Sequence, residues 1–188
     1  MSTPTHRRGA AVDERVLEAT LALLAEHGYE FTIEQVAGVA EVHKTTIYRR
    51  WDTKPALVAA AVQQLANQSV EVIASGDPLA DLTTLAVQVA AALRHPAGLN
   101  ALRAALTTSG ADPELGAVAG RFLNSRYLVA TPLVESAQEL GLLRADLDPV
   151  LVWQAIVNPL HLNAVTGGRV DDATARSLVD LVLRGARA

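Results

Sequence analysis

Basic, hydroxyl-bearing and aromatic side chains concentrate in one short stretch, HKTTIYRRWDTK, at residues 43–54. Guanidinium and ammonium groups bind phosphate oxygens, whereas small polar side chains at the start of a helix reach base edges in the DNA major groove. The stretch therefore predicts contact with double-stranded DNA. The candidate DNA-contacting residues, including a nearby helix cap, are Thr32, His43, Lys44, Thr45, Thr46, Tyr48, Arg49 and Lys54.

The basic charge of the chain is local. The stretch holds Lys44, Arg49, Arg50 and Lys54 against Asp52, a net charge of +3, in a chain whose formal net charge is −4. A basic patch on an acidic molecule favours a defined docking surface over diffuse attraction to polyanions. The alternative is a solvated basic turn between packed helices, because basic pairs are common on protein surfaces.

Composition excludes several classes of protein. The chain has 188 residues, half of them hydrophobic, which is enough for a sizeable core. It has no cysteine, so disulfides and thiolate metal sites are excluded. No apolar run approaches the roughly 18 residues of a membrane span, and no signal-peptide segment follows the N-terminal arginines. We therefore expect a cytoplasmic protein with no cofactor and no metal.

The spacing of apolar residues is helical nearly throughout, which predicts an all-α fold. Within residues 11–55 it indicates a helix that ends near His27 and short helices over about 33–40 and 44–50. Two short helices joined by a tight break, with a supporting helix before them, are typical of a helix-turn-helix. The second short helix of such a motif lies in the major groove.

Capping signals mark where these helices begin. Thr32 is a good N-cap, and Gln35 stands three residues later, as in a capping box. Thr53 caps a fourth helix that runs to about residue 74, long enough to reach from one domain into another. Before the first helix, residues 1–10 are expected to form a flexible arm.

Turn signals separate longer helices beyond residue 77. Pro132 and Pro159 fall inside two of the predicted spans and should kink them. The spans are 79–94, 97–109, 113–140, 149–166 and 171–185.

The stretch FTIEQVAGVAEVHKTTIYRRWDTKPALV, residues 31–58, resembles the DNA-binding domain of the TetR family of bacterial transcriptional regulators. RVLEATLALLAEHGYE upstream resembles the first helix of that family, and DPEL, GLLRADLDP and NPL resemble one of its recurring C-terminal types. The resemblance implies a helix-turn-helix domain over residues 11–55 and a helical regulatory domain over 56–188. It also implies a repressor that binds a palindromic operator as a homodimer.

Two residues depart from the family pattern in the turn of the motif. Glu41 stands where the family usually has glycine, and a non-glycine residue with positive φ costs about 1 kcal/mol. His43 stands where Ser or Thr usually caps the recognition helix, and histidine is a poor cap. Either the turn has a different shape or some stability is lost; His43 would then be free to contact a phosphate.

The resemblance further implies that the C-terminal domain dimerises and binds a small-molecule effector. The helices over 149–166 and 171–185 are unusually apolar, and a four-helix bundle with a second copy would bury that surface. Packing within the chain accounts for part of it. The candidate ligand residues are polar or aromatic side chains on otherwise apolar helices: Gln88, Phe122, Arg126, Tyr127, Trp153, Asn158 and His161.

Several of these candidates have a structural alternative. Trp153 is more often a core or interface residue than a ligand contact. Arg126 fits a surface or salt-bridge position equally well. Asn158 and His161 flank Pro159, and either side chain would satisfy a backbone carbonyl freed by the kink.

Two other functions are alternatives to a ligand-responsive repressor. A DNA-binding regulator without a small-molecule effector, controlled by a protein partner or by its abundance, predicts a C-terminal core without a cavity. An all-helical enzyme needs a catalytic cluster, but the five histidines are scattered and HExxH, GxSxG and phosphate-loop motifs are absent from the sequence. We therefore do not expect an enzyme.

Overall fold

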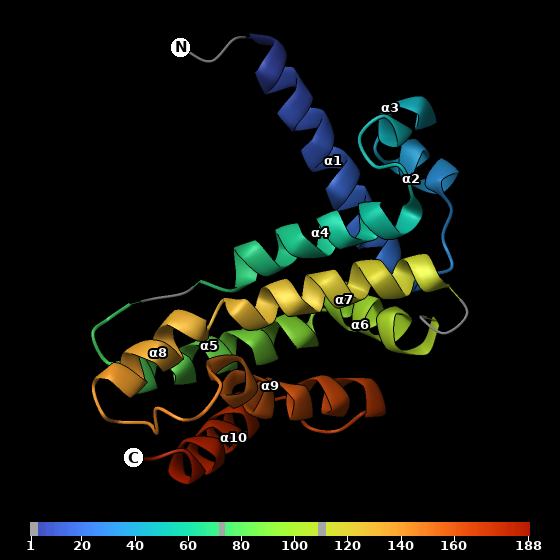
Figure 1. Ribbon diagram of the computed structural model, residues 1–188. Coiled ribbons are helices and arrows are strands. Elements are labelled where there is room, and N and C mark those ends of the chain that lie inside the picture. The colour runs from blue at the N-terminus through green and yellow to red at the C-terminus, as the bar shows by residue number, and fades with distance from the viewer. Residues whose placement is uncertain (1–3, 72–73, 109–111) are drawn as a thin grey trace. The chain divides into compact units, whose positions relative to one another are not determined.

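The computed structural model describes residues 4–71, 74–108 and 112–188, and every regular element in these residues is an α-helix (Figure 1). Contacts divide the chain into an N-terminal unit, residues 1–65 and 96–120, and a C-terminal unit, residues 66–95 and 121–188. The helices are α1 Pro4–His27, α2 Ile33–Val39, α3 Lys44–Tyr48, α4 Lys54–Ser69, α5 Pro78–Arg94, α6 Pro96–Thr108, α7 Pro113–Leu128, α8 Thr131–Glu139, α9 Pro149–Thr166 and α10 Asp172–Gly185.

The N-terminal unit has a core that joins α1, α2, α3 and the first half of α4. Val16, Val36, Ile47 and Leu57 are fully buried in it. Helix α6 also packs against α1, where the Asn100 side-chain amide donates to the Leu24 carbonyl over 2.9 Å. The Leu24 carbonyl also accepts the Gly28 N–H over 3.1 Å, and the Asn100 amide reaches the neighbouring Ala25 carbonyl over 3.3 Å, so Asn100 adds bonds to the last turn of α1. By packing, α6 thus groups with the first helix, although its sequence position lies in the predicted regulatory domain.

The signals that start and end the first helices are confirmed. Gly28 takes the left-handed conformation after α1, with φ 61°. Thr32 and Gln35 form the predicted capping box, in which each side chain bonds the backbone N–H of the other residue. The start of α1 differs from the prediction: the helix begins at Pro4, where the predicted arm covered residues 1–10, and residues 1–3 lie outside the described part. Proline suits a first helical turn because the N–H it lacks has no partner there.

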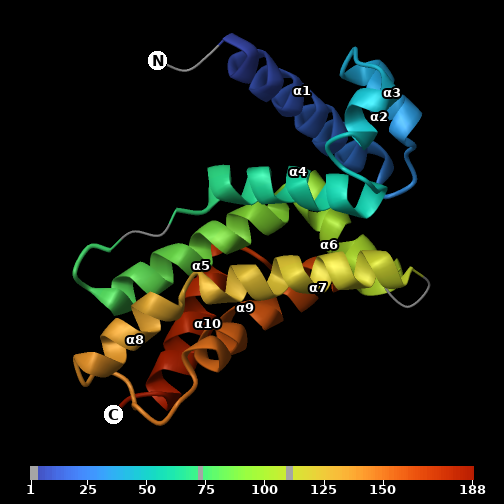
Figure 2. The ribbon, with the colours of Figure 1, turned by 45° about the horizontal axis from the view of Figure 1, so that its top comes forward.

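In the C-terminal unit, α5 packs against α8, α9 and α10, and Figure 2 shows it running past them. Leu82, Val134, Ile156 and Leu160 are fully buried. Pro159 lies inside α9, as predicted. The predicted single helix over 113–140 is wrong, because the structure has two helices there.

Proline explains the break between α7 and α8. Pro132 lies in the first turn of α8, where its missing N–H costs nothing. Inside a continuous helix its ring would clash with the carbonyl four residues earlier. Helix α7 therefore ends at Leu128, and the chain restarts at Thr131.

Helix α4 is shorter than predicted, because it ends at Ser69 and not near residue 74. Asn and Ser near its end are weak helix formers. Beyond them, the Glu71 N–H donates to the Gln88 side chain over 2.9 Å instead of continuing the helix. Residues 72–73 of the predicted span lie outside the described residues.

Candidate nucleic-acid interface

Helix α3 presents its polar side chains outward from one buried anchor. Ile47 is fully buried in the N-terminal core. Lys44, Thr45 and Arg49 are exposed, Tyr48 keeps 45% of its surface, and Thr46 is half-buried. The predicted recognition surface is therefore accessible on one short helix.

The turn between α2 and α3 keeps a glycine-type geometry without glycine. Glu41 has φ 53°, and its N–H donates to the Gly38 carbonyl over 3.3 Å. The Val42 N–H donates to the Ala37 carbonyl over 3.0 Å. These two bonds form a Schellman motif, whose left-handed position usually holds glycine. The turn thus has the expected shape, and the non-glycine residue carries the strain.

His43 precedes α3 in an extended conformation and makes no side-chain capping bond. The Thr46 N–H instead donates to the His43 carbonyl over 2.8 Å. The exposed imidazole is therefore not used in holding the helix.

Charge on this surface is partly compensated by neighbours. Lys44 Nζ lies 3.2 Å from Glu34 Oε1 of α2, and both side chains are exposed. A backbone hydrogen bond and then Lys44 lower the pKa of Glu34. Arg50 pairs with Asp13 of α1, which joins the end of α3 to the supporting helix. Neither carboxylate was singled out from the sequence, because nothing in the local pattern shows which acidic residue faces α3.

Lys54, a predicted phosphate contact, makes several contacts within the fold. Its Nζ donates to the Tyr29 carbonyl over 2.5 Å and to the Phe31 carbonyl over 2.6 Å. The same ammonium lies 4.0 Å from the Tyr29 ring centroid and 4.5 Å from that of Phe31. Burial lowers the pKa of Lys54. The side chain ties α4 to the loop before α2, which gives Lys54 a structural role beside the predicted phosphate contact.

The hydroxyl of Thr32 is also engaged within the fold. It accepts from the Gln35 N–H and lies 3.2 Å from Gln35 Oε1. The residue is exposed, so a further acceptor or donor can still approach it.

Three predicted ligand residues come together in the C-terminal unit. The Tyr127 hydroxyl donates to Asn158 Oδ1 over 2.8 Å, and the Tyr127 ring centroid lies 6.5 Å from that of His161. Burial raises the pKa of Tyr127 and lowers the pKa of His161 to about 4. The imidazole is therefore neutral near pH 7. We call Tyr127, Asn158 and His161 the polar cluster.

Arg126 adjoins the polar cluster along α7. Its guanidinium lies 3.3 Å from Asn67 Oδ1 near the end of α4, and burial lowers its pKa. No carboxylate forms an ion pair with Arg126 in the described residues. The partner of this half-buried guanidinium is the neutral side-chain amide of Asn67.

The other predicted ligand residues lie elsewhere. Trp153 is 3% exposed and belongs to the core, in line with its structural alternative. Gln88 accepts the Glu71 N–H, which occupies its carbonyl oxygen. Phe122 is half-buried on α7, and no ring contact joins it to the polar cluster in the described residues.

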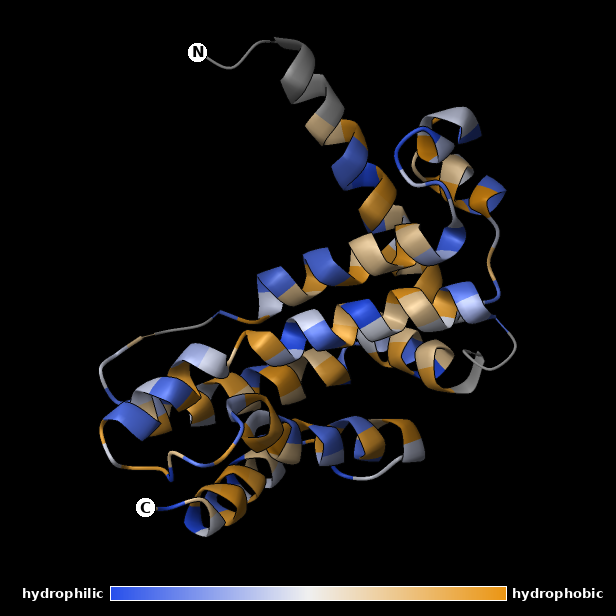
Figure 3. Cartoon of the chain, in the orientation of Figure 1, coloured by the Kyte–Doolittle hydropathy of each residue, from blue (hydrophilic) through white to orange (hydrophobic). Residues whose placement is uncertain are grey.

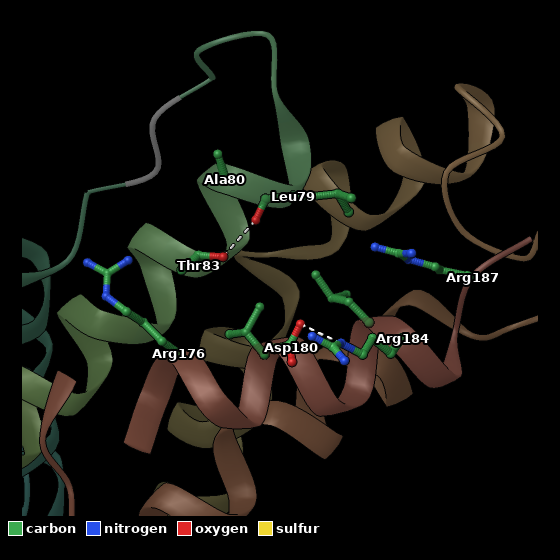
Figure 4. A pocket seen from close by; sticks show the side chains of 9 residues that line it. Leu79, Ala80, Thr83, Arg176, Asp180, Arg184 and Arg187 are labelled. Atoms are coloured by element: carbon green, nitrogen blue, oxygen red, sulfur yellow. Dashed lines mark hydrogen bonds and ion pairs between the residues drawn. The ribbon is translucent and has the colours of Figure 1, made fainter. Parts of the chain in front are cut away.

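A groove that the sequence did not indicate lies between α5 and α10 (Figure 4). Its volume is about 270 Å³, and its walls come from residues 79–83 and 176–187. None of the seven predicted ligand residues lines it. Helical periodicity identifies the buried side of each helix but not a groove between two helices that are distant in the sequence.

The described part of the chain offers neither a membrane span nor a metal-binding cluster. No helix there has the length and apolar character needed to cross a membrane. Nor do three or more His, Asp or Glu side chains in those residues gather as metal ligands would.

Comparison with known proteins gives consistent matches along the chain. Residues 16–61 match the family described as bacterial regulatory proteins, tetR family, and residues 72–182 match the tetracyclin repressor-like C-terminal domain. The regulator YdeS of Bacillus subtilis is 29% identical, covering 97% of this chain and 95% of its own. AqdR of Rhodococcus erythropolis is 28% identical, covering 98% and 93%.

Solved structures share the fold. The TetR family regulator SCO0332 superposes with a TM-score of 0.79 and 27% identity, covering 94% of this chain and 99% of its own. FadR of Bacillus subtilis, solved in complex with stearoyl-CoA, superposes with a TM-score of 0.70 and 16% identity, covering 93% and 99%.

Proposed function

Because the chain belongs to the TetR family of bacterial transcriptional regulators, we propose that it binds a palindromic DNA operator as a homodimer and represses transcription until a small-molecule effector releases it. The observation that carries the DNA-binding step is the surface of α3, where polar side chains project from the buried Ile47. Thr45 and Thr46 would read base edges, whereas Lys44, Tyr48 and Arg49 would contact phosphates.

The proposed dimer uses the outer faces of α9 and α10. Leu151 and Leu162 are 58% and 61% exposed, and eleven residues place them on one side of α9. Leu181 of α10 is 70% exposed. Apolar residues run along both helices in Figure 3. Burial of these leucines against a second copy would remove them from water, and two recognition helices would then meet successive major grooves.

The proposed effector site is the polar cluster with Arg126. FadR, which shares the fold, was solved with stearoyl-CoA, so this architecture accommodates a ligand in that protein. Here Asn158 lies between Leu151 and Leu162 on the exposed side of α9, next to the proposed dimer face. A ligand that displaced the Tyr127–Asn158 bond would alter that face, and one that engaged Arg126 would loosen its bond to α4.

The protein is released from DNA if the effector binds one of two arrangements of the C-terminal unit more tightly than the other. DNA affinity then falls by the ratio of the effector's affinities for the free and the DNA-bound protein. An effector that binds both forms equally tightly would contradict the mechanism. It would favour a regulator controlled in another way.

The DNA-binding step is tested by selecting bound sequences from a random DNA pool and measuring their affinity by fluorescence anisotropy at several salt concentrations. Arg49→Gln should weaken binding to every sequence and lower the salt slope by about 1. Thr45→Ala and Thr46→Ala should change which sequences are preferred. Arg121→Gln, an exposed arginine on α7, is the matched control and should leave both properties unchanged. Unchanged preference in both threonine variants would contradict the base-reading role.

A further inference from the structure

The groove between α5 and α10 has an apolar floor. Val179 and Leu183 of α10 are 2% and 8% exposed, and Leu79 of α5 faces them across the groove. The Thr83 hydroxyl, also in the lining, donates to the Leu79 carbonyl over 2.9 Å, so its hydrogen is already used. The floor therefore offers contact to an apolar chain and little hydrogen bonding.

Charge in the groove is positive and concentrated at its ends. Arg176 and Arg187 lie at opposite ends in Figure 4, with Asp180 and Arg184 between them. Arg184 Nε lies 2.8 Å from Asp180 Oδ1, so these two charges neutralise each other. The Arg176 and Arg187 side chains have no hydrogen bond or ion pair with any residue that the structure describes. Two available guanidiniums thus flank an apolar floor in a protein of net charge −4.

The groove is separate from the proposed dimer face of α10. Leu181 lies two residues from both Val179 and Leu183, which places it about 160° away from each around the helix. A second copy that covers Leu181 therefore leaves the groove floor accessible. None of the residues of the polar cluster lines the groove, so it is also distinct from the proposed effector site.

We infer that this groove binds an elongated apolar molecule with a carboxylate at each end. Nine residues at helical rise separate Arg176 from Gly185, the last residue of α10, by about 14 Å, and Arg187 follows two residues beyond the helix. The long side chains shorten the span that a ligand must cover. Each carboxylate would accept charge-assisted hydrogen bonds from one guanidinium. The methylene chain would lie on Leu79, Val179 and Leu183 and leave water. A small inorganic anion would reach one end and leave the floor uncovered.

The test is isothermal titration calorimetry of the full chain with three ten-carbon probes at pH 7.5: decanedioate, decanoate and decanol. Decanedioate should bind most tightly, decanoate about tenfold or more weakly, and decanol weakest, because each step removes one charged contact. Arg176→Gln and Arg187→Gln should each reduce decanedioate affinity about tenfold or more and leave decanol binding unchanged. Arg121→Gln should affect none of the three probes.

A second variant tests the apolar floor without removing charge. Ala80 lines the groove and is exposed, so Ala80→Phe adds a ring in the groove without disturbing the core. It should weaken binding of all three probes, while circular dichroism and thermal unfolding stay as in the unmodified protein. Equal affinity for the three probes, or full decanedioate binding by the Arg176→Gln/Arg187→Gln double variant, would overturn the inference. Neither result depends on DNA binding or on release from DNA.

Discussion

Lys54 has a structural role in the fold and a predicted role in DNA binding, and one substitution can distinguish the two. In Lys54→Met the aliphatic stem remains, but the ammonium that bonds the Tyr29 and Phe31 carbonyls is removed. The two rings beside it also lose a cation at 4.0 and 4.5 Å from their centroids. The variant therefore tests the attachment of α4 to the loop before α2.

The expected magnitude follows from these contacts. A hydrogen bond from a charged donor contributes about 1.5–3 kcal/mol net, and a partly exposed cation–π contact about 0.5–1 kcal/mol. Removing the ammonium from a half-buried site also removes a desolvation cost, which the lowered pKa of Lys54 reveals. We therefore expect Lys54→Met to lower the free energy of unfolding by about 2–3 kcal/mol.

Urea unfolding monitored by circular dichroism measures the loss in free energy of unfolding. DNA binding at several salt concentrations measures the contribution of Lys54 to phosphate contact. Lys54→Met should leave the salt slope unchanged at a temperature where the variant is folded. The control, Arg49→Gln, should do the opposite: unfolding within about 0.5 kcal/mol of the unmodified protein and a salt slope lower by about 1. If Lys54→Met unfolded normally but lost one unit of salt slope, the structural role would be refuted.

Three further substitutions test the turn, the polar cluster and the dimer. Glu41→Gly removes the strain of φ 53° and should raise the free energy of unfolding by about 0.5–1 kcal/mol in urea; a decrease would contradict that account. His161 has a folded pKa of about 4 against an ordinary 6.5, so the unfolded chain binds the proton more readily, and stability should fall by about 2–3 kcal/mol as pH drops from 6.5 to 4. Urea unfolding of His161→Gln should lack that part of the pH dependence, and an unchanged profile would show that His161 is not its source. Leu181→Glu should convert a dimer to a monomer in light scattering after size exclusion, whereas the exposed Leu106→Glu should not; a Leu181→Glu dimer would move the interface elsewhere.

Local signals were sufficient for the helix-turn-helix. The capping box at Thr32 and Gln35, the glycine after α1 and the buried Ile47 all depend on residues within one or two turns. The family pattern placed Glu41 at a glycine position but left the shape of the turn open, and the structure shows that Glu41 takes a left-handed φ of 53°. Short-range geometry of this kind can be predicted from neighbouring residues in the sequence.

The extent of the longer helices was less predictable. Pro132 was expected to kink a helix, and instead it starts a new one. Helix α4 ends at Ser69, and the N–H of Glu71 just beyond it donates to the side chain of Gln88, seventeen residues later in the chain. A sequence pattern shows that a helix is disturbed, but the partner that replaces the next helical bond lies on another element.

The sequence by itself determined the all-α class, the family and the residues that α3 presents, since periodicity, caps and motif spacing are properties of neighbouring residues. Only the tertiary structure decided that Lys54 faces the carbonyls of a loop, that Trp153 is core, and that Tyr127 meets Asn158. It also revealed the groove between α5 and α10, whose lining residues Leu79 and Val179 are 100 residues apart in the chain. The physical reason is that a side chain's type sets which contacts it can make, whereas its partner is set by how distant helices pack.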